Sequence, residues 1–64
     1  MSDKDAVLAA YADLVKKLSS IYLDAQMLAP DDAAKKEVDN KFKKGLAAAR
    51  TARDRALGLV GVPA

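Results

Sequence analysis

The stretch LAPDDAA at residues 28–34 separates two long helical patterns and decides the predicted fold. Pro30 lacks an amide hydrogen and its ring clashes with the preceding turn, so a first helix is expected to end by about residue 29. The same proline, followed by Asp31 and Asp32, is typical of a helix start, where carboxylates favour the positive end of the helix dipole. Two long helices joined by so short a turn must lie antiparallel.

The first helix is predicted over residues 3–29. Ser2 and Asp5 are spaced as a capping box, although that motif more often has Glu or Gln in its second position. No Gly or Pro interrupts the segment, and Leu8, Val15 and Tyr22 widen its apolar stripe. The stripe itself follows an unbroken heptad pattern with alternating spacings of four and three residues: Val7, Tyr11, Leu14, Leu18, Ile21, Ala25 and Leu28.

The second helix is predicted over residues 31–57. Oppositely charged side chains lie four residues apart at Glu37–Lys41 and Asp39–Lys43, the spacing of helix-stabilising ion pairs. The later glycines and Pro63 are expected to end this helix and leave a short apolar tail at residues 58–64, which either frays or docks. Its stripe has the same alternating spacing but mostly small members: Val38, Phe42, Gly45, Ala49, Ala52, Ala56 and Leu59.

The two stripes are unequal, and this inequality predicts association. A face made largely of alanine cannot cover the larger side chains of the first helix, and each large apolar side chain left in water forgoes about 1.5–3 kcal/mol. We therefore expect an all-α antiparallel helical hairpin, completed as a four-helix bundle by dimerisation or by packing on a partner. The residues predicted for the core or for self-association are Val7, Tyr11, Leu14, Leu18, Ile21, Tyr22, Leu28, Val38, Phe42 and Leu46.

Composition argues against catalysis. The 64 residues include no Cys and no His, which removes the commonest nucleophile and general base, and a carboxylate-bridged metal site would need more than the single Glu. No glycine-rich loop could hold a phosphate, and Asp31 with Asp32 is better explained by helix capping. We expect no enzyme activity, no metal and no cofactor. Neither a signal peptide nor a membrane span is predicted, so the expected location is the cytoplasm, or the host cytoplasm or virion for a viral protein.

Basic residues on the second helix allow two interpretations. Residues 1–30 carry one net negative charge and residues 31–64 three net positive charges. Lys36, Lys43 and Arg50 repeat at seven residues, with Arg53 near the same flank, so the row could contact nucleic-acid phosphates. Alternatively, these side chains form a solvated flank of a helical bundle, and no aromatic residue beside them supports base stacking.

A second contact surface is predicted on the back of the first helix. Leu23 and Met27 fall outside the main stripe, where they either contact another subunit or protein or are isolated exposed side chains. The short length, the Pro-Asp turn and the paired heptads resemble, in architecture, the small plasmid-encoded hairpin dimers that modulate RNA pairing. No residue motif is shared, so no RNA-contacting position is transferred.

The favoured function is a small non-enzymatic interaction module that associates with itself and with another protein. Such a module would act as an adaptor, an inhibitor or a small component of an assembly such as a virion. The alternative is a regulator that binds RNA or DNA through the basic row on the second helix.

Overall fold

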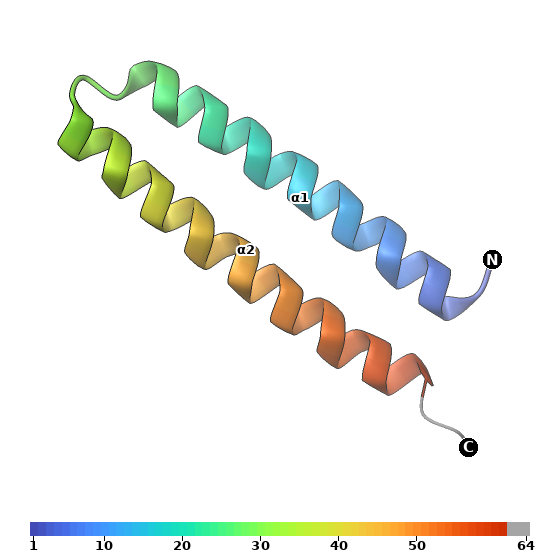
Figure 1. Cartoon of the computed structure of the whole chain (residues 1–64). Coiled ribbons are helices and arrows are strands. Elements are labelled where there is room, and N and C mark those ends of the chain that lie inside the picture. The colour runs from blue at the N-terminus through green and yellow to red at the C-terminus, as the bar shows by residue number, and fades with distance from the viewer. Residues whose placement is uncertain (62–64) are drawn as a thin grey trace.

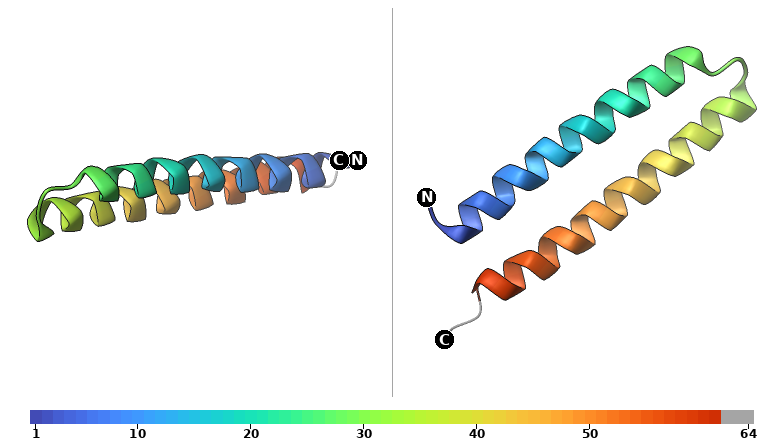
Figure 2. Two further views of the ribbon diagram at one scale, coloured as in Figure 1. Left: turned by 90° about the horizontal axis from the view of Figure 1, so that it is seen from above. Right: turned by 180° about the vertical axis from the view of Figure 1, so that it is seen from behind.

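The computed structural model describes residues 1–61 and shows an antiparallel hairpin of two helices, α1 (Asp3–Leu28) and α2 (Asp32–Gly61). The helices lie side by side along their whole length, and the start of α1 and the end of α2 lie opposite the turn (Figure 1). Viewed from above, the hairpin is a thin, slightly twisted slab (Figure 2), with principal extents of 52 × 18 × 7 Å. The predicted all-α hairpin is confirmed.

Side-chain caps fix the starts of both helices. The Ser2 hydroxyl accepts a hydrogen bond from the Asp5 amide at 3.1 Å, and the Asp5 carboxylate accepts one from the Ser2 amide, which forms the predicted capping box. The Asp31 carboxylate accepts from the amide of Ala34 at 2.8 Å and so caps α2. The capping role expected for the paired aspartates is therefore confirmed for Asp31.

The predicted end of the second helix is wrong. We expected α2 to stop near residue 57, but it continues through Gly58 to Gly61. A helical glycine costs only about 1 kcal/mol relative to alanine, which does not outweigh the hydrogen bonds of a continuing helix. Four residues of the predicted tail are thus helical, and residues 62–64, including Pro63, lie outside the described part of the chain.

The contact between the helices is made by side chains that are mostly half-buried. Ala49 is the only residue within 1–61 that is fully buried, with 5% of its surface exposed. The rings of Tyr22 and Phe42 lie 4.5 Å apart between centroids, and Gly45 lies against the Leu18 side chain. Ala49 and Gly45 are small, so the helix backbones approach closely along this seam.

The single hairpin does not enclose a core. Its radius of gyration is 15.1 Å, whereas a globular chain of this length has one of roughly 11 Å. Within the described residues, neither helix is long and apolar enough to cross a membrane. The apolar side chains that the hairpin fails to cover therefore become the natural candidates for a functional surface.

Candidate functional site

The structure divides the predicted core residues into two groups. The first group lies half-buried in the seam between α1 and α2 and comprises Val7, Tyr11, Leu18, Tyr22, Val38, Phe42 and Leu46. The second group is exposed: Leu14 by 42%, Ile21 by 66% and Leu28 by 83%. These three lie seven residues apart, so successive members are offset by only about 20° around the helix. They form a continuous apolar row along one side of α1.

Two open grooves lie beside this row. One has a volume of about 320 Å³ and is lined by Leu18, Ile21, Tyr22, Ala25, Val38, Lys41 and Phe42. The other has a volume of about 240 Å³ and is lined by Val7, Ala10, Tyr11, Leu14, Ala49, Ala52, Arg53 and Ala56. Their walls are almost entirely apolar, with a charged side chain, Lys41 or Arg53, on the α2 side of each.

Both grooves open on the same face of the hairpin. Leu14 and Ile21, one in each groove, are seven residues apart on α1. Lys41 and Ala52, again one in each groove, are eleven residues apart on α2. Eleven residues make three full helical turns plus about 20°, so these two side chains lie on the same side of α2. We call this side, marked by Leu14 and Ile21 on α1 and by Lys41 and Ala52 on α2, the grooved face.

A polar network closes the seam on the opposite side. The Tyr22 hydroxyl and the Gln26 amide nitrogen each lie 2.7 Å from Asp39 Oδ1 and donate to it, and the same nitrogen lies 3.1 Å from the Lys35 carbonyl. The bond to Asp39, together with desolvation and the carboxylate charge, raises the pKa of Tyr22 above 10.0, against a smaller lowering by Gln26. The network joins the helices near the turn and fixes their register there.

This network replaces a predicted surface ion pair. Asp39 was expected to pair with Lys43, and Glu37 with Lys41, but the ion pair found within residues 1–61 is Arg53–Asp54 at 2.9 Å. Asp39 instead turns toward α1. Gln26 was not predicted as a site residue, and its sequence position gives no signal, because its role depends on which residues of the other helix lie opposite.

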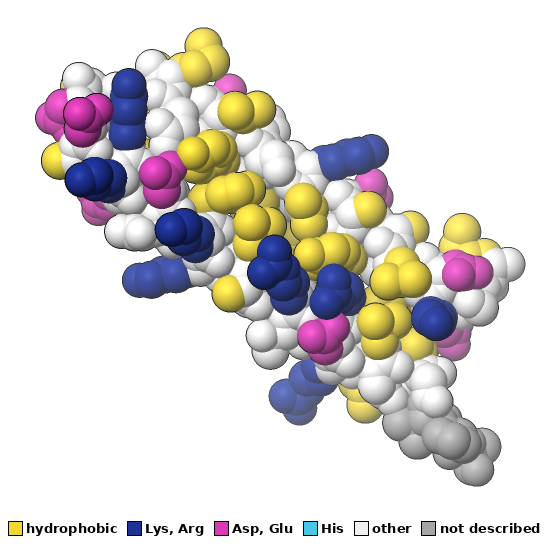
Figure 3. Space-filling model, in the orientation of Figure 1, with side chains coloured by type: hydrophobic (Ala, Val, Ile, Leu, Met, Phe, Trp, Pro, Cys, Tyr) yellow, Lys and Arg dark blue, Asp and Glu magenta, His cyan; other side chains and the backbone are white. Residues whose placement is uncertain are grey.

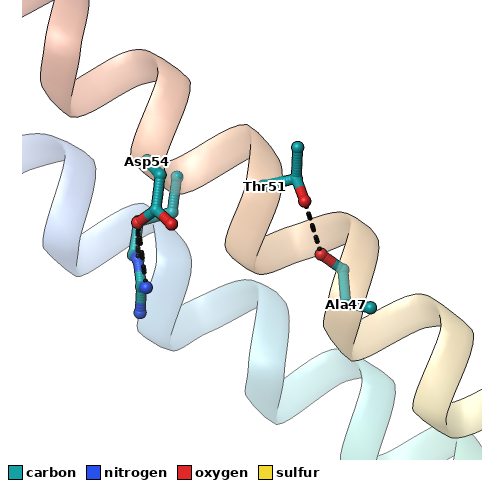
Figure 4. Close-up of polar contacts among 4 residues, drawn as sticks. Ala47, Thr51 and Asp54 are labelled. Carbon is teal, nitrogen blue, oxygen red and sulfur yellow. Dashed lines mark hydrogen bonds and ion pairs between the residues drawn. The ribbon is translucent and has the colours of Figure 1, made fainter.

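Arg53 is engaged within the hairpin. Its guanidinium carbon lies 4.6 Å from the centroid of the Tyr11 ring, and two of its nitrogens bond to Asp54 Oδ1. Figure 4 shows this ion pair next to the Thr51 hydroxyl, which donates to the Ala47 carbonyl one turn back at 3.1 Å. Of the four predicted phosphate contacts, Arg53 is thus the one already held by neighbouring side chains.

The other three predicted phosphate contacts, Lys36, Lys43 and Arg50, are exposed. Their spacing places them in one row about 21 Å long on α2. On the side of the hairpin seen in Figure 3, hydrophobic side chains follow the seam, and Lys and Arg side chains follow α2 beside it. The structure therefore presents an apolar seam and a basic flank together.

The predicted second contact residues lie apart from the grooved face. Leu23 is 60% exposed and Met27 is 84% exposed. Leu23 follows Ile21 by two residues, which places it about 160° away around α1. Leu23 and Met27 therefore form an exposed apolar surface on the side of α1 away from Leu14 and Ile21.

Among residues 1–61, no cluster of three or more acidic side chains is arranged to hold a metal ion. No known protein family, characterised protein or solved structure matches the chain. The described fold is that of a two-helix hairpin whose candidate site is an apolar face rather than a set of reactive groups.

Proposed function

We propose that this protein is a small non-enzymatic interaction module that self-associates through the uncovered apolar surface of α1 and binds a further macromolecular partner. The observation that carries the proposal is the exposed row of Leu14, Ile21 and Leu28, which stands beside two apolar grooves. Side chains of this size stabilise a protein when they are removed from water, and the single hairpin leaves them exposed.

The area of the accessible surface also supports this proposal. The chain exposes 5069 Å². A folded monomer of 6.8 kDa exposes roughly 4,000 Å², so this hairpin has about 1,100 Å² more than its mass requires. A stable protein interface covers about 800 Å² on each partner. The surplus is therefore enough to form one interface of ordinary size.

The second apolar surface supports a further partner. Leu23 and Met27 point away from the grooved face, so a subunit bound there would leave them accessible. We propose that another protein binds this surface, as expected for an adaptor, an inhibitor or a small component of a larger assembly such as a virion. The compartment expected for this role is the cytoplasm, or the host cytoplasm or virion of a viral protein.

Sedimentation equilibrium of the purified chain tests self-association. We expect a dimer or larger species that dissociates when Ile21 is replaced by Lys. Leu23→Lys is the matched control, since the two side chains have similar exposure but lie on opposite sides of α1. Circular dichroism should show that both variants remain helical. A stable monomer of the unaltered chain would refute the proposal.

A second candidate function, regulation through RNA or DNA binding, is favoured by the exposed row of Lys36, Lys43 and Arg50. Each phosphate contact releases counterions, so the logarithm of the affinity should fall with the logarithm of salt concentration by about 0.9 per contact. Lys43→Gln should reduce that slope by about one, while Lys4→Gln, on α1, should leave it unchanged. No binding at about 50 mM salt would exclude this function.

A further inference from the structure

We infer that the grooved face binds a second copy of this chain by a two-fold rotation about an axis parallel to the helices. In that arrangement α1 of each copy packs on α2 of the other, and both turns lie at the same end of the four-helix bundle. The inference rests on the self-association proposed above and adds to it the occupied face and the orientation of the two copies.

The grooved face is covered by a second copy because its size and its composition fit one. It is continuous along the hairpin, since both grooves open on it, and it carries the two large side chains Leu14 and Ile21. The surplus surface of about 1,100 Å² derived from chain mass matches what each subunit contributes to a stable dimer. A two-fold contact of this kind also closes on itself and leaves no further grooved face exposed.

Side-chain size determines the direction of the axis. On the grooved face, α1 presents the large apolar residues Leu14 and Ile21, whereas the middle of α2 presents Ala48 and Ala52. Larger side chains lie at either end of this small stretch of α2: Lys41 before it, and Leu59, 73% exposed and seven residues after Ala52, beyond it. An axis parallel to the helices places Leu14 over the small residues of the partner subunit's α2, so large and small side chains interdigitate in the middle of the bundle. An axis perpendicular to the helices would place large on large and small on small. That packing would separate the α1 helices and leave voids between the α2 helices.

The parallel axis also determines which residues meet. Rotation about this axis leaves the height of each residue along the hairpin unchanged. Each α1 residue therefore meets the part of the partner subunit's α2 that lies at the same height. Two contacts define these levels within one hairpin: Leu18 with Gly45, and Tyr11 with Arg53. Leu14, between Leu18 and Tyr11, therefore packs over the alanines near residue 49 of the partner subunit.

Lys41 is compatible with this interface despite its charge. By the same levels, it meets Ile21 of the partner subunit, because the Tyr22 and Phe42 rings are in contact within each hairpin. The four-carbon stem of Lys41 can cover this isoleucine while its ammonium group extends to the edge of the interface and stays in water. The Lys41 charge therefore does not have to be buried for the two copies to join.

Spin-label distances test the orientation, and the absence of cysteine allows single labels without background. Ala33→Cys places a label on exposed residue 33, next to the turn. With the parallel axis, the two labels lie at the same end, separated by roughly 20–35 Å across the width of the bundle. With the perpendicular axis, they lie at opposite ends of a hairpin that is 52 Å long.

A label at exposed Ala47, near the middle of the hairpin, is the matched control, since either axis gives a short distance there. Short distances at both positions are the expected result. A short distance at position 47 with a distance near 50 Å at position 33 would overturn the parallel axis and leave self-association intact. No dipolar coupling at either position, together with monomeric sedimentation, would overturn both the orientation and the proposed function.

Discussion

Gly45 lies directly against Leu18: a Cβ atom at position 45 would be 3.3 Å from Leu18 Cδ2 and 3.8 Å from Leu18 Cδ1. The 3.3 Å distance is tighter than ordinary van der Waals contact, so the absence of a side chain at Gly45 sets how closely α1 and α2 approach. The glycine is thus a packing residue of the hairpin and not a helix breaker.

Gly45→Ala should stabilise the hairpin less than Gly58→Ala does. Both changes gain helix propensity of about 0.5–1 kcal/mol. At Gly58 nothing lies within 4 Å of an added Cβ, so the full gain is expected, whereas at Gly45 the Leu18 side chain has to shift. Urea unfolding at one fixed protein concentration measures both values, since association also contributes to stability. Equal gains would mean that the Leu18 contact costs nothing.

Tyr22 should lose its proton at a higher pH than an unperturbed tyrosine. Its pKa is raised above 10.0, chiefly because its hydroxyl donates to Asp39. Since the folded-state pKa exceeds the unfolded one, this bond stabilises the fold fully below pH 10 and stops doing so as the pH rises through the folded-state pKa. Tyr11→Phe leaves Tyr22 as the sole tyrosine, so its ultraviolet absorbance reports this titration alone.

The control for that titration is Asp39→Ala, made in the Tyr11→Phe background. Without the carboxylate, the Tyr22 midpoint should move down toward 10.0, because the main cause of the shift has been removed. An unchanged midpoint in this variant would show that the carboxylate does not bind the hydroxyl in solution.

Asp31→Ala should destabilise the protein by about 1 kcal/mol, the usual effect of losing an N-cap side chain. The reason is the 2.8 Å bond that the Asp31 carboxylate accepts from the Ala34 amide. Asp32→Ala is the matched control: it removes a neighbouring charge from the first turn but no cap, and should cost only a few tenths of a kcal/mol. Thermal unfolding followed by circular dichroism measures both, and equal losses would argue against Asp31 as the cap.

Tyr11 and Arg53 should be energetically coupled by roughly 0.5–1 kcal/mol. The Arg53 guanidinium lies over the Tyr11 ring, and its side chain is only 28% exposed. A double-mutant cycle with Tyr11→Leu and Arg53→Met isolates this coupling, because both replacements keep apolar bulk. In an Asp54→Ala background, which removes the ion pair, the coupling between Tyr11 and Arg53 should persist. Loss of the coupling in that background would mean that it depends on Asp54 holding the Arg53 side chain in place.

Much of the fold was predictable because it depends on local signals. The heptad spacing around Leu14 and the break at Pro30 predict both helices and their antiparallel arrangement, and Ser2 with Asp5 predicts the first cap. The end of α2 was not predictable in this way. Gly58 is a weak signal, since one glycine disfavours a helix without ending it.

The candidate site was only partly predictable. Heptad analysis grouped Ile21 with Leu18, yet in the hairpin Leu18 is half-buried and Ile21 is mostly exposed. Periodicity shows which residues share a stripe, but not which edge of that stripe the second helix leaves uncovered. Asp39 shows the same limit, because its contact with Tyr22 depends on the register of two segments that are 17 residues apart.

The polar bonds between α1 and α2 in the described residues all lie close to the turn, where Tyr22 and Gln26 reach Asp39 and Lys35. Toward the chain ends, the helices are joined by apolar contacts and by the stacking of Arg53 on Tyr11. The two helices are therefore held more firmly together beside the turn than at the opposite end, where they can separate more easily. Amide hydrogen exchange should be slowest beside the turn, and a partner could widen the open end without breaking the polar network.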